Sequence, residues 1–516
     1  MKRTYLSLLL FVFISFVSIN QTNSLVKNNI EEVVQLPSQI ADIDDIVEGA
    51  LKDFDVPGVA IGVIYDGKIV LSKGFGYRDL SENLKVDSNT LFSIASNSKA
   101  FTAFIMGQLV DEGKLSWDDP VIQYIPEFRL TNPEITQQVT IRDLLAHRTG
   151  LPRHDFLWLN QEMERDSIIE KISYLDFASP FRQEFQYNNL TYTIAGFIIE
   201  RVTHMSWEEN VATRVLAPLK MNNSNFNADM LNTDNYSMPY AEIDGQIHSL
   251  EFLNPYLIGP AAGINSNVTD MLKWVSMQMS EGMFDGKAQI QKSTLEEIHT
   301  LQMPISDMSP PGMEIYPLGY SLGWFNGMYR GYFFLEHGGS MDGYISQVSI
   351  LPQKKIAVVI LSNSSSDGTL ITKSLSRTII DKLLNEQKED WLAMSMAERA
   401  DKKSHALQMF ESNYGGYSST ISPSQLKEYE GEYEHPGYGP VKVVCENDHL
   451  VATYGNNIMD LEHLSEGVFE WKVTAFLAFG EKVKMDISFS KDDHGQYEMI
   501  IPFEPAVEPI HFKKSA

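Results

Sequence analysis

Ser96 and Lys99 form a Ser-x-x-Lys pair within the run LFSIASNSKAFTAFIMGQLVDEG. Residues i and i+3 share one face of a helix, so this spacing places the lysine amine beside the serine hydroxyl. A serine hydroxyl becomes a strong nucleophile when a neighbouring base takes its proton. A lysine can be that base only where burial or nearby positive charge lowers its pKa. The pair predicts nucleophilic catalysis in an enclosed cleft, although such a tetrapeptide also occurs by chance as a surface pair.

A helix is expected over residues 95–112, because apolar side chains recur there at helical spacing and Gly113 follows as a C-cap. The start of this helix would present unpaired backbone N–H groups close to Ser96. Such groups stabilise the oxyanion that develops during attack on a carbonyl carbon.

A second pair of candidate residues is Tyr187 and Asn189, which precede an apolar stretch over residues 192–199 that is expected to be helical. A phenol can relay a proton between a nucleophile, a lysine and a leaving group. An asparagine amide can donate to a substrate carbonyl. A core tyrosine beside a helix cap is the alternative interpretation of this motif on its own.

The third candidate motif is the run Glu336-His337-Gly338-Gly339-Ser340. Paired glycines after an apolar run let a substrate approach the backbone of an edge strand closely. His337 could hydrogen-bond to a substrate or steer it by charge. The alternative is a simple glycine turn carrying a solvent-facing histidine.

Taken together and in this order, Ser-x-x-Lys, Tyr-x-Asn and His-x-Gly resemble the serine β-lactamase and penicillin-binding protein superfamily. The likeness is greatest to its class C-like branch, which includes DD-carboxypeptidases, D-aminopeptidases and esterases. It covers about residues 40–385, and the segment 146–152 (AHRTGLP) also resembles the family. The resemblance implies that Ser96 is acylated while Lys99 and Tyr187 share general base and acid work.

The same resemblance implies substrate-binding roles for Asn189, His337 and Gly339, and an oxyanion hole made of the backbone N–H groups of Ser96 and Ser340. His337 and Gly339 would occupy the places of Lys and Gly in the Lys-Thr-Gly motif of true β-lactamases. The chain thereby lacks a cation and a hydroxyl that would engage a carboxylate. Peptide (including D-residue), amide or ester hydrolysis is therefore expected ahead of efficient β-lactam hydrolysis.

The elements that would position these residues read as an α+β fold. A helix over residues 40–54 precedes apolar strands at 58–65 and 68–75, joined by Asp66-Gly67. Two more strands, 343–351 and 355–362, lie near the other end of the domain and lead into a helix over 372–384. We expect a β-lactamase/transpeptidase-like architecture, with one antiparallel sheet assembled from both ends, flanking helices and a helical insertion.

The predicted organisation is a signal peptide at 1–24, a serine hydrolase domain at 25–388, a helical segment and linker at 389–424, and a small all-β domain at 425–516. Short alternating runs in this last part predict a lipocalin-like barrel. It is expected to contribute to stability, cleft shape or oligomerisation. Its aromatic residues are expected to be core rather than binding residues; they include Tyr429, Tyr433 and Tyr438.

Composition narrows the functional classes further. The formal charge of −27 disfavours nucleic acid and anionic membranes, and one cysteine permits no intrachain disulfide. Without a Cys/His cluster at ligand spacing, neither a metal nor another cofactor is expected. Two basic residues before a 14-residue apolar run predict export to a periplasm or the extracellular space, with no membrane span in the mature chain.

The leading functional hypothesis is thus a secreted hydrolase, a peptidase (carboxypeptidase included) or esterase, acting on a small peptide, amide or ester. The competing hypotheses are a catalytically silent scaffold that binds peptidoglycan or serves as an extracellular component, and an acyl-trapping sensor. An α/β-hydrolase is disfavoured because no Gly-x-Ser-x-Gly elbow surrounds Ser96.

Overall fold

The structure is a computed structural model of the 516-residue chain, and it describes residues 34–243, 245–305, 314–413, 421–473, 483–491 and 495–515. The predicted signal peptide lies outside the described residues. Within the described part, no helix combines the length and the apolar character needed to cross a bilayer.

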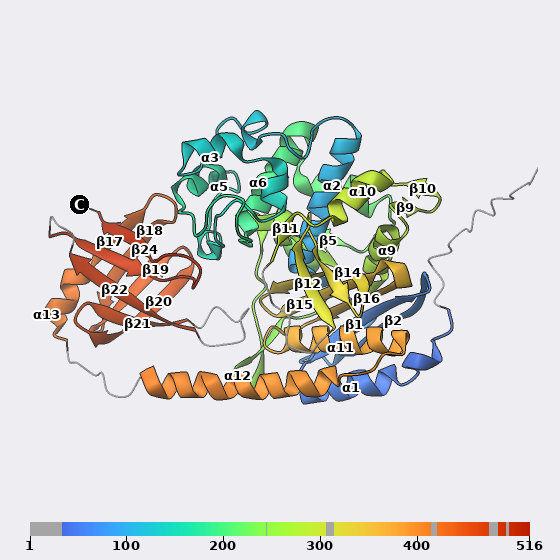
Figure 1. Cartoon of the computed structure of the whole chain (residues 1–516). Helices are drawn as coiled ribbons and strands as arrows, with labels where there is room; N and C mark the ends of the chain where they lie inside the picture. Colours follow the sequence, from blue (N-terminus) through green and yellow to red (C-terminus); the bar gives the residue numbers. More distant parts are fainter. Residues whose placement is uncertain are drawn as a thin grey trace, which may run out of the picture.

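The largest element is an antiparallel sheet of nine strands among the described residues (Figure 1). Its strands, in their order across the sheet, are β11 (Met303–Pro304), β12 (Ile315–Tyr320), β13 (Phe325–Tyr329), β14 (Tyr332–Met341), β15 (Tyr344–Leu351), β16 (Ile356–Ser362), β1 (Gly58–Tyr65), β2 (Lys68–Asp79) and β3 (Leu84–Lys85). β1 pairs with β16, with Ile61 opposite Ile360. The expected sheet built from both ends of the domain is therefore confirmed.

The hairpin between β1 and β2 follows from its turn residues. Asp66 and Gly67 have φ values of 48° and 74°. Two successive positive φ angles define the turn whose twist matches paired strands, and Asp-Gly supplies them at low cost. The turn predicted from the sequence is therefore present.

Both faces of the sheet are covered, because alternate residues of β1 enter different cores. Val59, Ile61 and Val63 pack with α1 (Ile43–Asp53) and α11 (Gly368–Leu384). Ala60 and Ile64 belong to the other core, together with the helices of the catalytic side. A strand with every interior position apolar is what burial on two faces requires.

The helical part lies over the second face, as Figure 1 shows. Its helices are α2 (Ser98–Asp111), α3 (Pro133–Gln138), α4 (Ile141–Leu145), α5 (Ser167–Lys171), α6 (Asn189–Thr203), α7 (Trp207–Val211), α8 (Gly259–Ala262), α9 (Val268–Met279) and α10 (Lys292–His299). Short strands accompany them: β4 (Phe92–Ser93), β5 (Asn225–Phe226), β6 (Tyr240–Ile243), β7 (Gln246–Ser249), β8 (Ile264–Ser266), β9 (Met283–Phe284) and β10 (Lys287–Ala288). α2 runs through the centre and is buried on nearly all sides, with Phe101 stacked on Trp274 at 4.0 Å. Its central position places the predicted nucleophile, Ser96, in the middle of the domain.

The C-terminal part is a closed antiparallel barrel, which confirms the predicted fold. Its strands are β17 (Gly431–His435), β18 (Gly439–Glu446), β19 (His449–Tyr454), β20 (Asn457–Ser465), β21 (Val468–Val473), β22 (Val483–Lys491), β23 (Tyr497–Ile501) and β24 (Ile510–Lys514). Tyr429, Tyr433 and Tyr438 are buried, as expected of core residues. The long helix α12 (Trp391–Asn413) runs towards the barrel, and the short helix α13 (Pro423–Leu426) precedes it (Figure 1).

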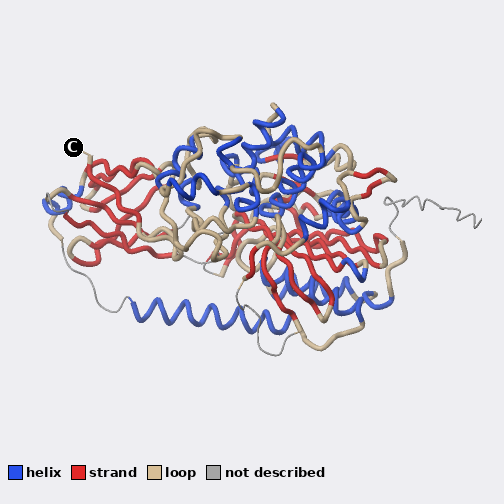
Figure 2. The backbone as a smooth tube through the Cα atoms, turned by 45° about the horizontal axis from the view of Figure 1, so that its top comes forward, coloured by secondary structure: helices blue, strands red, loops and turns tan. Residues whose placement is uncertain are grey.

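The barrel packs against the loops of the helical part, which Figure 2 shows as tan segments beside the red barrel strands. The Tyr454 hydroxyl donates to the carbonyl of Phe156 at 3.0 Å, and the Phe156 ring stacks on Phe503 at 4.4 Å. Asn160 Nδ2 donates to Asn457 Oδ1 at 2.9 Å. The junction thus combines an aromatic core with specific polar contacts.

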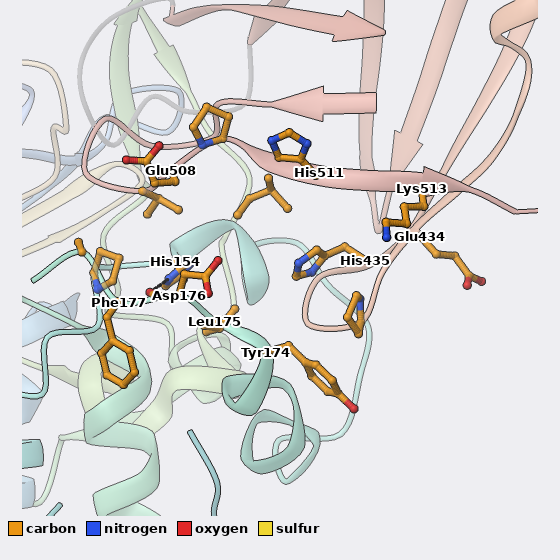
Figure 3. Close-up of a pocket in the computed structure, with 16 residues that line it drawn as sticks. His154, Tyr174, Leu175, Asp176, Phe177, Glu434, His435, Glu508, His511 and Lys513 are labelled. Carbon is orange, nitrogen blue, oxygen red and sulfur yellow. Dashed lines mark hydrogen bonds between the residues drawn. The ribbon is translucent and has the colours of Figure 1, made fainter. Parts of the chain in front are cut away.

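A cavity of about 370 Å³ lies at this junction (Figure 3). His154 and Asp176 line it from the helical part, and His435 and His511 line it from the barrel. The lining contains none of the predicted catalytic residues, so this cavity is separate from the candidate active site.

Candidate active site

Ser96 lies in a 3-10 turn, Ala95–Asn97, that leads directly into α2. The sequence predicted one helix from residue 95, whereas the α-helix begins at Ser98. In a 3-10 turn the side chains of residues i and i+3 eclipse each other, so the tighter start still stacks Lys99 over Ser96. Ala95 has a φ of 45°, a conformation that costs energy for a residue with a Cβ and is typical of functional turns.

The turn is held in place from strand β15. Ser346 Oγ donates to the carbonyl of Ile94 at 2.7 Å and accepts from Asn97 Nδ2 at 2.8 Å. Both contacts are buried, where a hydrogen bond is costly to break. The nucleophile is therefore fixed against the sheet as well as by its own helix.

Lys99 is fully buried, and its Nζ has three oxygen neighbours. Ser96 Oγ lies at 3.2 Å, Asn189 Oδ1 at 2.7 Å and the carbonyl of Ala261 at 3.2 Å. Burial, helped by the charge of Arg153, holds the pKa of Lys99 well below its usual value, and Asp155 opposes this only in part. A neutral amine has two N–H groups and one lone pair.

The direction of the Lys99 Nζ lone pair follows from the partners of the two N–H groups. The Ala261 carbonyl and Asn189 Oδ1 accept only, so they take the two N–H groups of the neutral amine. The lone pair then faces Ser96 Oγ, as a general base requires. The structure thus brings together the first predicted catalytic pair in a reactive arrangement.

Tyr187 lies beside this pair, with its ring centroid 4.7 Å from Lys99 Nζ. Burial raises the pKa of the Tyr187 phenol above its usual value, and a hydrogen bond with Ser96 acts in the opposite direction. The phenol is therefore protonated at neutral pH. Ser96 lies between an amine that can accept a proton and a phenol that can supply one.

His147 accepts hydrogen bonds from the residues on either side of Tyr187. The backbone N–H of Gln186 donates to the His147 carbonyl at 2.8 Å, and that of Asn188 donates to His147 Nδ1 at 3.1 Å. The two rings pack 4.4 Å apart. Burial holds the pKa of His147 well below its usual value, so Nδ1 stays a neutral acceptor. In the sequence His147 stands in the family-like segment 146–152, and nothing there predicts its role beside Tyr187.

Asn189 is the first residue of α6 and is buried. Its Oδ1 accepts from Lys99, and its Nδ2 donates to Asp155 Oδ1 at 2.8 Å. Because a carboxylate only accepts, this second bond fixes which end of the amide faces the lysine. Asn189 Nδ2 carries a second N–H group, so the predicted contact with a substrate carbonyl is compatible with the bond to Asp155 and stays a prediction.

Asp155 is a functional candidate that sequence reasoning missed. Besides Asn189, it accepts from Trp158 Nε1 at 2.8 Å and from Arg153 Nε at 2.6 Å. The signal available was the charged pair Arg153 and Asp155 within the otherwise apolar run 151–159. Charged residues in such a run are buried only when they are paired.

His337 lies on β14 and is buried, not solvent-facing. Its Nδ1 lies 2.6 Å from the carbonyl of Gly338 and its Nε2 3.0 Å from the Tyr320 hydroxyl. Burial and the charge of Lys99 lower the pKa of His337 to about 3. His337 is thus a neutral side chain that orients strand β14, with both ring nitrogens engaged by protein groups.

Gly339 explains how β14 reaches the nucleophile. A Cβ at this position would lie 2.1 Å from the Ile94 carbonyl oxygen and 2.4 Å from Ser346 Oγ. Only a residue without a side chain permits this approach. The next residue, Ser340, is exposed. The proposed pairing of the Ser96 and Ser340 N–H groups as an oxyanion hole is compatible with this placement and stays a prediction.

Across the described ranges, no group of three or more His, Cys, Asp or Glu side chains is arranged to hold a metal ion. The candidate site consists instead of a closed series of contacts that runs from Ser96 through Lys99, Asn189, Asp155 and Arg153 to Tyr187. The arrangement can activate a hydroxyl, supply a proton and hold both groups rigidly.

Comparison with known proteins agrees with this geometry. The sequence profile of the family described as Beta-lactamase matches residues 43–376, and that of a domain of unknown function, DUF3471, matches residues 418–514. Unguisins hydrolase ungD of Aspergillus violaceofuscus is 29% identical over 436 residues, which cover 78% of this chain and 76% of that protein. Protein flp of Staphylococcus aureus is 25% identical over 364 residues, covering 68% and 70% respectively.

Among solved structures, the octameric penicillin-binding protein homologue from Pyrococcus abyssi is similar over most of its length. It has a TM-score of 0.59 and 25% identity, and the alignment covers 92% of this chain and 100% of that one. That coverage extends beyond the sheet and helices into the barrel. The resemblance inferred from the three motifs is confirmed.

Proposed function

Because the chain belongs to the Beta-lactamase family, whose profile covers residues 43–376, we propose that it is a serine hydrolase that forms an acyl-enzyme at Ser96. The observation that carries the proposal is the buried Lys99 amine, whose Nζ lies 3.2 Å from Ser96 Oγ. The name of one relative, a hydrolase at 29% identity, supports the same class of activity.

Acylation begins when Lys99 Nζ takes the hydroxyl proton while Ser96 Oγ bonds to the carbonyl carbon of the substrate. The carbonyl π electrons move to oxygen, where the N–H groups of Ser96 and Ser340 would stabilise the charge. Collapse of this intermediate breaks the bond to the leaving group, which takes its proton from Tyr187. The Lys99 ammonium then returns a proton to Tyr187, so the charge balance is restored.

Deacylation repeats these steps with water as the nucleophile. Lys99 Nζ takes a proton from water while the water oxygen bonds to the acyl carbon. The bond between the acyl carbon and Ser96 Oγ then breaks as Tyr187 protonates the departing Ser96 oxygen, and the Lys99 ammonium returns a proton to Tyr187. Both half-reactions need the neutral amine and the protonated phenol. The opposite pKa shifts of Lys99 and Tyr187 favour these two states at neutral pH.

The substrate class is proposed to be a peptide (including D-residue peptides), an amide or an ester. The neutral, buried His337 offers no cation to a drug carboxylate at strand β14, which argues against efficient β-lactam hydrolysis. Secretion is part of the proposal, supported by the basic start and apolar run of residues 1–24.

The test is turnover of a substrate panel by the mature chain: p-nitrophenyl esters, D-amino-acid p-nitroanilides and a chromogenic cephalosporin. Ser96→Ala is compared with Ser81→Ala, an exposed serine whose loss should not affect turnover. Turnover of an ester or anilide that is lost only in Ser96→Ala supports the proposal. Absence of turnover from folded protein contradicts it, and a stable acyl adduct without turnover would identify an acyl-trapping protein instead.

A further inference from the structure

Lys99 and Arg153 both lie beside the ring of Tyr187. Lys99 Nζ lies 4.7 Å and Arg153 Cζ 5.1 Å from the ring centroid. Lys99 is fully buried, whereas the side chain of Arg153 is 40% exposed. Arg153 is therefore a cation that a molecule in solution can reach, beside the same ring as Lys99.

Asp155 fixes the orientation of the Arg153 guanidinium but engages only some of its N–H groups. Its Nε and Nη2 both lie 2.6 Å from Asp155 Oδ2. The other oxygen, Asp155 Oδ1, is occupied by Asn189 and Trp158. Within the described ranges, Arg153 Nη1 makes no hydrogen bond to a protein acceptor. A planar guanidinium held along one edge presents its remaining N–H groups in a fixed geometry that matches a carboxylate.

We propose that Arg153 binds a carboxylate of the substrate, so that the natural substrates are anionic peptides, amides or esters. This inference rests on the proposed function and gives its substrate class. It places anion recognition on the loop after residue 152 instead of on strand β14, where His337 is neutral and enclosed. The strongly negative chain makes a local, well-oriented cation necessary for such a substrate.

The C-terminal part of the chain contributes the carboxyl group of Glu504, which interacts electrostatically with Arg153. Glu504 Oε1 accepts from the backbone N–H of Phe156 at 3.4 Å. Burial, followed by the charge of Asp155, raises the pKa of Glu504 to about 8, and Arg153 acts in the opposite direction. Below this pH Glu504 is neutral and leaves the charge of Arg153 available. Above it, the Glu504 carboxylate competes with a substrate carboxylate.

The other titratable groups around this cluster have defined states at neutral pH. Burial keeps Lys99 and His154 towards their neutral forms and keeps the phenols of Tyr187 and Tyr438 protonated. Arg153 stays charged: burial acts to lower the pKa of its guanidinium, but the charge of Asp155 and the hydrogen bond to it act in the opposite direction, and the pKa is raised. The pKa of Glu504, about 8, predicts that this carboxyl group changes charge between pH 7 and 9.

The test compares matched esters that differ by one carboxylate. The p-nitrophenyl monoester of adipic acid carries an anion on the acyl side, and p-nitrophenyl hexanoate is its neutral counterpart. 4-Carboxyphenyl hexanoate and its ring methyl ester place the anion on the leaving group. Rates are corrected for uncatalysed hydrolysis. The readout is the ratio of kcat/KM for each anionic and neutral pair, which cancels any effect of Arg153 on Lys99.

In Arg153→Gln the ratio should fall about 10- to 100-fold for one of the two pairs, as expected for a lost charged hydrogen bond. Arg153→Lys keeps the charge but loses the planar guanidinium with its paired N–H groups. Its ratio should therefore lie between those of the unmodified chain and Arg153→Gln. In the unmodified chain the ratio should decline as pH rises through about 8. In Glu504→Gln that decline should be absent.

A ratio that Arg153→Gln leaves unchanged for both pairs, in a chain that turns over the neutral esters, overturns the inference and leaves the proposed function intact. If no ester is turned over, a binding measurement tests the inference instead. Calorimetry with adipate on Ser96→Ala should show binding that is lost in Ser96→Ala/Arg153→Gln. Equal binding to the two variants, or none to either, overturns the inference independently of catalysis.

Discussion

The amide of Asn189 donates to Asp155 Oδ1 at 2.8 Å, and this bond turns the amide oxygen towards Lys99. One buried carboxylate thereby fixes the orientation of a residue that contacts the catalytic amine. The same carboxylate aligns Arg153 beside Tyr187. Asp155 thus connects both proton-handling residues without contacting either.

Asp155→Asn should reduce kcat by about 10- to 100-fold, because the amide orientation of Asn189 is no longer fixed by a pure acceptor. Asp155 also raises the pKa of Lys99, so its neutralisation should lower that pKa further. Since activity requires neutral Lys99, the acidic limb of the pH profile should move to lower pH. A kcat/KM profile across pH 4–9 measures both effects. An acidic limb that moves to higher pH would contradict this account.

Lys99→Arg should abolish turnover, with a loss of about 10³-fold or more, because a guanidinium does not deprotonate in proteins. The change keeps a long nitrogen-containing side chain and removes the neutral amine that can act as a base. Lys292→Arg, at a surface lysine 54% exposed, is the matched control and should retain full activity. Retention of more than a tenth of the activity in Lys99→Arg would exclude Lys99 as the general base. Initial rates on the best ester of the panel are sufficient for this test.

His147 is predicted to position Tyr187 through one side-chain acceptor. In His147→Ala the Asn188 N–H loses its partner, and kcat should fall about 10- to 100-fold. In His147→Asn the amide oxygen can take the place of Nδ1, so much of the loss should be recovered. KM should change less than kcat in both variants. Equal losses in the two variants would show that ring packing, rather than the acceptor, matters.

Gly339 and Gly338 provide a matched pair on β14. A Cβ at Gly339 would lie 2.1 Å from the Ile94 carbonyl oxygen, whereas at Gly338 its nearest neighbour is Gln347 Oε1 at 3.4 Å. Gly339→Ala should therefore displace the nucleophile turn and cost about 1–3 kcal/mol of unfolding free energy. Gly338→Ala should be close to neutral. Denaturant unfolding together with ester turnover separates these outcomes, and equal behaviour of the two variants would refute the close-approach argument.

The sequence predicts the parts of this protein whose signal is local. Strand periodicity gave the two hairpins of the large sheet, the Asp66-Gly67 turn and the barrel. The i, i+3 spacing of Ser96 and Lys99 survives the change from helix to 3-10 turn, because both geometries place these residues together.

Other features could not be read from the sequence because they depend on distant segments. Asp155 becomes significant only through Asn189, 34 positions away. His337 has the residue type of a substrate ligand, but its Tyr320 partner and its burial make it a neutral structural group. Glu504 approaches Phe156 across 348 positions, through a domain contact that no local pattern encodes.

The central claim is that Ser96 is the nucleophile. Its most direct measurement is intact-protein mass spectrometry after incubation with a fluorophosphonate probe, with peptide mapping of the modified site. The account predicts one adduct in the unmodified chain, located on Ser96, retained in Ser81→Ala and absent in Ser96→Ala. An adduct that persists in Ser96→Ala, or folded protein that is not modified at all, would contradict it.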